Sequence, residues 1–180
     1  MMFSQRRFIL KTLVALSTLS LVLPAPAATV KAVDVLKRGE LAPPLVLHTL
    51  DGQQIATRDL IGHVVIVTFW ASWCGPCREE LPILSAYAAR HAADGVRVLG
   101  FSIDAPDNKE DVRKVAATLS FPVGMLGSTY AGAYGRIWRM PVSFVIDRNG
   151  RLVDNGWDDP APEWTVERLK RVMDPLLIEK

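Results

Sequence analysis

The chain has 180 residues, of which 49% are hydrophobic and 22% charged, and its formal net charge is +2. This composition is typical of a globular domain with a buried core and excludes a fibrous or low-complexity chain. Residues 1–27 hold three basic residues and no acid, so the rest of the chain is close to neutral. Because that remainder has no basic cluster, we expect no nucleic-acid partner.

Residues 1–27 have the three parts of an export signal. QRRFILK is positively charged, LVALSTLSLVL is apolar, and APAA supplies a small-residue end. Arg6-Arg7 followed by apolar residues resembles the twin-arginine (Tat) pattern, although a Sec signal also begins with basic residues. The sequence predicts cleavage after Ala27, and an uncleaved leader that anchors the chain to the membrane is the alternative. In either case we expect the folded domain in the periplasm, where disulfides persist.

The folded domain is expected over residues 41–180, after a lead-in segment at 28–40. APPLVLHTLDGQQIATRDL predicts a hairpin of two short strands around Asp51-Gly52. GHVVIVTFW follows as a continuous apolar, β-branched run, which is typical of a strand covered on both faces.

A helix is predicted over residues 74–91, because Leu81, Leu84 and Ala88 recur at helical spacing. VRVLGFSI then predicts a second buried strand. A strand, a helix and a strand in this order form a β-α-β unit, so the two strands should be parallel.

The second half of the chain alternates in the same way. It reads as a helix in NKEDVRKVAATL, a short strand in SFPVGML, a loop with one helical turn in STYAGAYGRIW, a hairpin in MPVSFVIDRNGRLVDN that turns at Asn149-Gly150, and an amphipathic helix in APEWTVERLKRVMDPLL. Together these elements predict an α/β fold with a central mixed β-sheet and helices on both faces.

The two cysteines, Cys74 and Cys77, lie in the stretch FWASWCGPCREELP, where the first predicted strand gives way to a helix. They are one helical turn apart, so their side chains share a face and come within reach of a disulfide. Pro76 suits the first turn of a helix, and Gly75 lets another backbone approach the pair. The pair could do redox chemistry, bind a metal or fill space.

Position predicts different roles for the two thiols. Cys74 lies at the positive end of the helix dipole, beside unpaired backbone amides, and thiols placed there have pKa values of ~3.5 to ~7.5, compared with ~8.5 for free cysteine. Cys77 lies one turn deeper and should stay protonated until it is needed for the resolving step. The sequence therefore predicts that Cys74 attacks and Cys77 resolves.

A metal site is not expected. Two thiolates leave a tetrahedral zinc site half filled, and the three histidines, His48, His63 and His91, are scattered along the chain. We therefore expect no metal and no cofactor other than a redox-active Cys74–Cys77 disulfide.

Several stretches resemble one family. The motif WCGPC, with APPLVLHTLDG and VVIVTFW before it and MPVSFVIDRNG after it, resembles the periplasmic thioredoxin-like proteins of the TlpA/ResA type, from about residue 40 onward. The resemblance implies a thioredoxin-like fold with an N-terminal β-hairpin and an inserted helix near NKEDVRK. It also implies thiol–disulfide oxidoreductase activity.

The resemblance also implies roles for residues outside the cysteine pair. Met140-Pro141 matches the family's cis-proline loop, where the Met140 backbone could pair with an extended substrate. Glu80 matches the glutamate of the pattern C-x-x-E-x-P and could accept the Cys77 proton, unless it is a solvated helix residue. Trp73 is expected at a partly exposed flank of the substrate surface. The remaining tryptophans are expected to pack: Trp70, Trp138, Trp157 and Trp164.

The expected function is reduction of disulfides in exported client proteins such as apocytochrome c. The enzyme would then need a membrane electron donor of the DsbD/CcdA type. Two alternatives stay open. Copper(I) accepts two soft ligands, so the cysteine pair could handle copper for oxidase assembly, with Met140 nearby. The N-terminal part also resembles the broader redoxin group, which leaves a peroxiredoxin-like peroxide reductase as the other alternative.

Overall fold

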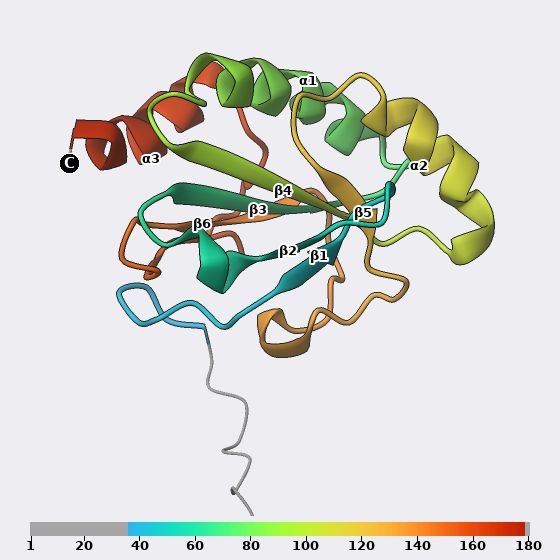
Figure 1. Cartoon of the computed structure of the whole chain (residues 1–180), viewed down its shortest axis with the longest axis horizontal. Coiled ribbons are helices and arrows are strands. Elements are labelled where there is room, and N and C mark those ends of the chain that lie inside the picture. The colour runs from blue at the N-terminus through green and yellow to red at the C-terminus, as the bar shows by residue number, and fades with distance from the viewer. Residues whose placement is uncertain (1–35, 179–180) are drawn as a thin grey trace, which may run out of the picture. The chain divides into compact units, whose positions relative to one another are not determined.

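The structure, a computed structural model, describes residues 36–178 (Figure 1). The predicted leader at 1–27 and most of the predicted lead-in at 28–40 lie outside the described residues. Within the part of the chain that the structure describes, no helix has the length and apolar character needed to cross a bilayer.

A mixed sheet of five strands, in the order β5-β4-β3-β6-β7, lies at the centre of the domain. The strands are β3 (Val64–Trp70), β4 (Val96–Ser102), β5 (Val123–Met125), β6 (Val142–Ile146) and β7 (Leu152–Asn155). β3, β4 and β5 are parallel, whereas β6 is antiparallel to β3 and β7 is antiparallel to β6. This arrangement confirms the predicted mixed sheet and the predicted parallel pair.

β3 is the central strand, and every one of its residues is buried. Its β-branched and aromatic side chains suit a strand that is covered on both faces. Because side chains alternate along a strand, they divide between two cores. Val64, Ile66 and Trp70 belong to one core cluster, and Val65, Val67 and Phe69 belong to the other.

The three α-helices, α1 (Gly75–Arg90), α2 (Lys109–Ala116) and α3 (Val166–Ile178), lie on one side of the sheet (Figure 1). Each contributes to the core cluster that contains Ile66, through Leu81, Val112 and Leu169 respectively. α2 is the inserted helix that the sequence predicts.

The other side of the sheet differs from the expectation of helices on both faces. It is covered by the hairpin of β1 (Val46–His48) and β2 (Gln54–Ala56) and by a loop with a single 3-10 turn, η3 (Gly132–Tyr134). A longer helix is not needed there, because Leu47, Ala131, Tyr134 and Ile137 already fill the second core. The 3-10 turn η1 (Thr57–Leu60) follows the hairpin directly, and a third, η2 (Pro106–Asn108), precedes α2.

The predicted hairpin joins the edge of the sheet at β5. The Leu50 amide donates a hydrogen bond to the Val123 carbonyl at 2.9 Å. A Cβ atom on Gly124 would overlap the carbonyl oxygen of His48, so only glycine allows the two backbones to come this close. The hairpin thereby closes the open end of the sheet on the side of the parallel strands.

The last helix begins later than predicted. The sequence predicts a helix from residue 161, whereas α3 begins at Val166. Pro160 and Pro162 explain the difference, because a residue that precedes proline is disfavoured in helical conformation. The segment before α3 is therefore extended, which leaves the Trp164 amide free to bond outside the helix.

Candidate active site

Cys74 is the N-cap residue of α1, at the point where the chain leaves β3, as the sequence predicts. It forms a disulfide with Cys77, with the two Cα atoms 5.3 Å apart. The Cys77 amide donates a hydrogen bond to the Cys74 Sγ at 3.2 Å. Cys74 is 6% exposed and Cys77 is fully buried, so Cys74 is the sulfur that a partner can reach. A backbone amide of the first helical turn that donates to a sulfur stabilises negative charge on it.

The residues around Cys74 leave it approachable. Trp73 is 62% exposed, in agreement with the exposure expected for it. A Cβ atom on Gly75 would meet no atom within 4 Å, so the space beside the disulfide is open to another backbone. Pro76 is exposed in the first turn of α1.

The Met140–Pro141 peptide bond is cis. Pro141 directly precedes β6, whose first residue, Val142, pairs with Phe69 near the end of β3. This register places the cis-proline loop at the edge of the sheet where β3 runs on to Cys74. Met140 packs against the core cluster that contains both cysteines.

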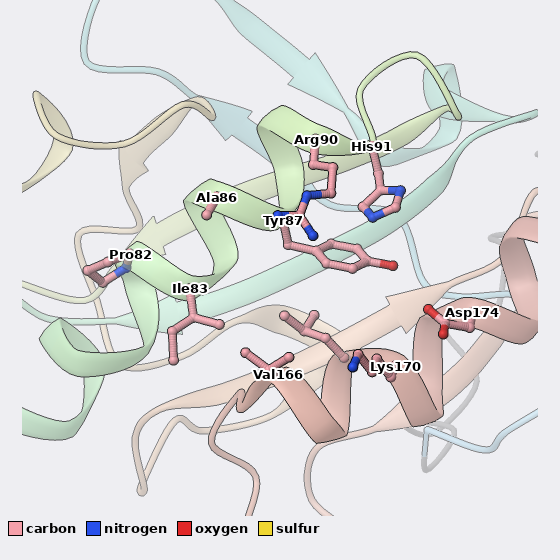
Figure 2. A pocket seen from close by; sticks show the side chains of 10 residues that line it. Pro82, Ile83, Ala86, Tyr87, Arg90, His91, Val166, Lys170 and Asp174 are labelled. Atoms are coloured by element: carbon pink, nitrogen blue, oxygen red, sulfur yellow. The ribbon is translucent and has the colours of Figure 1, made fainter.

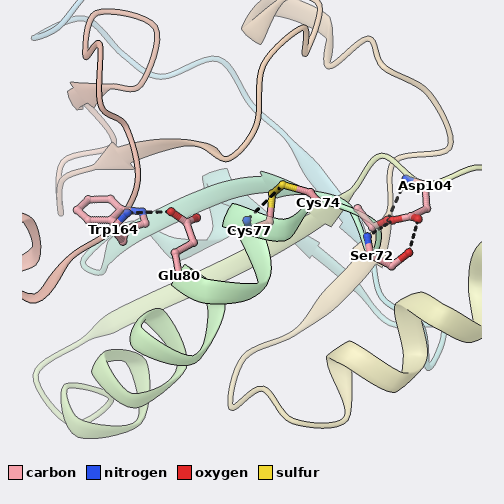
Figure 3. Close-up of a disulfide and its surroundings, with 7 residues drawn as sticks. Ser72, Cys74, Cys77, Glu80, Asp104 and Trp164 are labelled. Atoms are coloured by element: carbon pink, nitrogen blue, oxygen red, sulfur yellow. Dashed lines mark hydrogen bonds between the residues drawn. A yellow bond between two sulfur atoms is a disulfide. The ribbon is translucent and has the colours of Figure 1, made fainter.

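Glu80 is buried, with only 2% of its surface exposed, although it lies in a helix beside the exposed Glu79. The interpretation of Glu80 as a solvated helix residue is therefore wrong. Its Oε2 accepts a hydrogen bond from the Trp164 amide at 2.8 Å (Figure 3). Its Oε1 is buried and has no hydrogen-bond partner among residues 36–178.

Burial raises the pKa of Glu80 to about 8, and the Trp164 amide and the Arg168 charge oppose this shift only in part. A carboxyl group of this pKa takes up and releases protons in the same range as a cysteine thiol. Glu80 can therefore exchange a proton near neutral pH, and its free oxygen leaves one acceptor position available.

Trp164, whose amide binds Glu80, is held in place by a second buried cluster around Arg168, which the sequence did not predict. Arg168 is 3% exposed, stacks over the Trp164 ring at 4.1 Å and pairs with the buried Asp154 at 2.6 Å. It also donates a hydrogen bond to the Pro162 carbonyl at 2.6 Å. No helix or strand pattern predicts the bond from Arg168 to Asp154 or the bond from Trp164 to Glu80, because these bonds join residues 14 and 84 positions apart.

A second buried carboxylate, Asp104, was also missed. It follows β4 and binds Ser72, the residue two places before Cys74. A signal for it was present, since the carboxyl ends of the parallel strands β3 and β4 meet at one edge of the sheet. Ser72 follows β3 and Asp104 follows β4, so their contact could have been predicted from the parallel pairing of the two strands.

Trp138 departs from the expected packing role. It is 72% exposed, with its ring stacked on Trp157 at a centroid distance of 5.7 Å. The Arg139 guanidinium lies 5.5 Å from the Trp138 ring and donates hydrogen bonds to the carbonyls of Gly156 and Asp159. Trp138 is thus an oriented, exposed aromatic side chain three residues before Pro141. Trp70 and Trp164 are fully buried, as expected.

A groove of about 460 Å³ lies between α1 and α3 (Figure 2). Pro82, Ile83 and Val166 form part of its apolar lining, and Arg90 and Asp174 add charged groups to it. Neither cysteine nor Glu80 is in its lining, so the groove is separate from the disulfide. Among residues 36–178, no group of three or more histidine, cysteine or acidic side chains is arranged to hold a metal ion.

Comparisons with known proteins agree with this geometry. Residues 38–155 match the model of the AhpC/TSA family. The chain is 31% identical over 137 residues to the thiol-disulfide oxidoreductase ResA of Bacillus thuringiensis, across 74% of this chain and 78% of that protein. It is 31% identical over 159 residues to ResA of Geobacillus thermodenitrificans, across 84% of this chain and 87% of that protein.

The fold also matches solved structures. A candidate thiol:disulfide interchange protein DsbE from Chlorobium tepidum superimposes with a TM-score of 0.67 and 31% identity, over 79% of this chain and 99% of that one. The predicted thioredoxin-like fold is thereby confirmed. With its Cys74–Cys77 disulfide at the start of α1 and relatives that carry this activity in their names, the chain belongs to the AhpC/TSA family as a thioredoxin-like thiol–disulfide oxidoreductase of the TlpA/ResA type.

Proposed function

We propose that this oxidoreductase works outside the cytoplasm, where it reduces disulfides in exported client proteins. The observation that supports the proposal most directly is the unequal placement of the two sulfurs. Cys74 lies at the N-cap of α1 and is the accessible sulfur, whereas Cys77 is buried one turn deeper.

The first step is attack by the Cys74 thiolate on a client disulfide. A bond forms between Cys74 and one client sulfur, the client disulfide breaks, and the other client sulfur leaves as a thiolate that takes a proton from water. The open space beside Gly75 admits the client backbone. The Met140 backbone, next to the cis bond, can pair with an extended client segment as an added strand.

The second step frees the client. The Cys77 thiol gives its proton to Glu80, and the Cys77 thiolate attacks the Cys74 sulfur. The Cys74–client bond breaks, the client leaves as a thiolate, and the enzyme is left with the Cys74–Cys77 disulfide. Two electrons have then passed from the enzyme dithiol to the client disulfide. The pKa of Glu80, about 8, suits this proton transfer.

Reduction is the direction that the residues between the cysteines favour. Gly75-Pro76 is the thioredoxin-like pair, and thioredoxin has a potential of about −270 mV, compared with about −120 mV for the oxidant DsbA. The export signal predicted at 1–27 supports a periplasmic location. Apocytochrome c is the proposed client, and a membrane dithiol donor of the DsbD/CcdA type would return the enzyme to its reduced form.

Trapping of mixed disulfides tests the proposed roles of the two sulfurs. Cys77→Ser removes the resolving thiol, so we expect this variant to accumulate mixed disulfides with its clients in cells. Cys74→Ser is the matched control and should trap none, because the attacking sulfur is gone. Mass spectrometry of the trapped species identifies the client and its cysteine. Equal trapping by both variants would contradict the assignment.

A redox titration tests the direction separately. Equilibration of the protein with glutathione or dithiothreitol buffers, followed by counting of free thiols, gives the potential of the Cys74–Cys77 pair. We expect a value close to that of thioredoxin, about −270 mV. A value close to that of DsbA, about −120 mV, would overturn the reductant role and leave the oxidoreductase class in place.

A further inference from the structure

Asp104 is a buried carboxylate next to the active-site turn, and the reaction described above does not use it. It follows β4 and is only 1% exposed. Its Oδ2 accepts hydrogen bonds from the Ser72 amide at 2.8 Å and from the Ser102 hydroxyl at 2.7 Å, and its Oδ1 accepts one from the Ser72 hydroxyl at 2.6 Å. Both oxygens thus act as acceptors, as those of an ionised carboxylate do.

Ser72 connects this carboxylate to the reactive sulfur. It lies in the turn that links β3 to α1, which is closed by a hydrogen bond from the Cys74 amide to the Ala71 carbonyl at 3.1 Å. Two residues of chain span at most ~7 Å, so the Asp104 carboxylate lies on the order of 10 Å from Cys74. Figure 3 shows the Ser72–Asp104 contacts on one side of the disulfide and the Glu80–Trp164 contact on the other.

The two buried carboxyl groups differ in what they can do. Glu80 has a free oxygen and a pKa near that of a thiol, which suits proton transfer. Asp104 has no free oxygen, because each of its oxygens already accepts at least one short hydrogen bond. It is therefore suited to holding the turn and to exerting a constant charge, rather than to passing a proton.

We propose that Asp104 is a positioning residue for Cys74, which fixes the turn through Ser72 and places a buried negative charge that holds back ionisation of the sulfur. This inference rests on the proposed role of Cys74 as the attacking thiol. A less stable thiolate makes the dithiol form a better electron donor, just as the strongly stabilised thiolate of DsbA makes that protein an oxidant. Asp104 would thereby keep the enzyme toward the reducing end.

Loss of the fixed turn and loss of the buried charge should shift the ionisation of Cys74 in opposite directions. Release of the turn would move Cys74 away from the start of α1, and its ionisation would shift toward that of free cysteine, to higher pH. Loss of the negative charge would favour the thiolate and shift the ionisation to lower pH. The sign of the shift therefore separates a charge effect from simple loosening of the structure.

The experiment is alkylation of the reduced protein by iodoacetamide across pH, with mass spectrometry to read Cys74 and Cys77 separately. In Asp104→Asn we expect the midpoint of the Cys74 profile to fall, with roughly three- to tenfold more thiolate below that midpoint. The equilibrium with a dithiol buffer should shift by the same factor toward the reduced enzyme, by up to about 30 mV. Other charged groups near the site, Arg78, Glu80 and Arg139, are unchanged in this variant.

Asp107→Asn is the matched control, because Asp107 is an exposed acid only three residues along the chain. It should leave both the midpoint and the potential as in the wild type, since water screens its charge. An equal shift in Asp107→Asn would overturn the proposal by assigning the effect to net charge. A Cys74 midpoint in Asp104→Asn that stays the same or rises would also overturn it.

A further variant keeps the test open if Asp104→Asn does not fold. Ser102→Ala removes a donor to the carboxylate from outside the active-site turn and leaves its charge less compensated, so it should raise the Cys74 midpoint. A wild-type or lower midpoint in Ser102→Ala would overturn the proposal. The alkylation profile of the wild-type protein tests the proposed function separately from the role of Asp104. If Cys77 reacts before Cys74 in the wild type, the proposed function is wrong.

Discussion

Among individual residues, Glu80 is the one whose chemistry depends most on burial. The Glu80 side chain is on the buried face of α1, and its carboxyl group has a pKa of about 8, compared with an ordinary value of 4.5. Its neighbour Glu79 is exposed. Two adjacent glutamates thus have different properties, because the helix turns one of them toward the sheet and the other toward water.

This pKa predicts a pH dependence of stability in the oxidised protein. The folded chain keeps the Glu80 proton up to about pH 8, whereas the unfolded chain loses it near pH 4.5. The stabilisation is therefore complete below the lower value and is lost as the pH rises through the upper one. Glu80→Gln should remove this loss, which amounts to several kcal/mol by linkage.

Denaturant titrations of the oxidised protein across this pH range give the free energy of unfolding, and the disulfide keeps the cysteines from titrating. Glu79→Gln is the control and should follow the wild type at every pH. If Glu80→Gln shows the same slope of stability against pH as the wild type, the buried carboxyl group does not titrate as described.

The same residue should affect the second chemical step. Glu80→Gln keeps the shape of the side chain but cannot accept the Cys77 proton. We expect the mixed disulfide to resolve about a hundredfold more slowly near neutral pH, which is typical for loss of a general base. Rapid-quench kinetics with a purified mixed disulfide measure this rate, and an unchanged pH–rate profile would remove Glu80 from the mechanism.

Among the elements, the sequence predicts those whose pattern is local and misses the contacts between them. The sequence predicted β3 from its apolar run, α1 from its helical spacing and the turn at Asn149-Gly150 from its residue types, because each of these signals lies in neighbouring residues. Gly150 has a φ of +78°, which glycine adopts readily. The start of α3 and the contact between Trp164 and Glu80 could not be predicted from the sequence, since they depend on how distant segments pack together.

α3 and the segment before it are held to β7 by the buried pair of Arg168 and Asp154, with side chains 3% and 8% exposed. Removal of one partner leaves the other charge buried, so Asp154→Asn should destabilise the protein by about 3 kcal/mol. Chemical denaturation measures this change. The matched control is Asp111→Asn, which breaks the exposed pair with Lys114 and should have no measurable effect. Equal stability of the two variants would show that the buried pair does not hold α3.

At the scale of the whole molecule, the reactive features gather at one edge of the sheet. Cys74 follows β3, Asp104 follows β4 and Pro141 precedes β6, so that three strand ends supply the site. The sequence predicted the cysteine pair from its spacing and its place at the start of a helix, and predicted the cis proline and Glu80 through their resemblance to a family. A polar residue after each of the parallel strands β3 and β4 was a signal for Asp104 that was not used. The exposure of Trp138 had no such signal, because it follows from the folded loops.

Trp138 stands at this edge as an exposed, oriented aromatic ring, three residues before the cis bond. We expect Trp138→Ala to lower kcat/KM for a protein client by about tenfold, as loss of an aromatic anchor does. The rate with a small disulfide should not change, because such a substrate does not reach the ring. Ile61→Ala is the control, since Ile61 is 59% exposed but lies beside Gly150, near the opposite end of β6. Equal losses with both substrates would contradict a docking role.

The proposed mechanism depends on the ionised nucleophile being the sulfur at the start of α1, with the second sulfur buried one turn deeper. The most direct test is the rate of iodoacetamide alkylation of each cysteine in the reduced wild-type protein, from about pH 5 to about pH 9. We expect Cys74 to react faster than glutathione below neutral pH and Cys77 to stay protected. Reaction of both thiols no faster than glutathione, or reaction of Cys77 first, would contradict it.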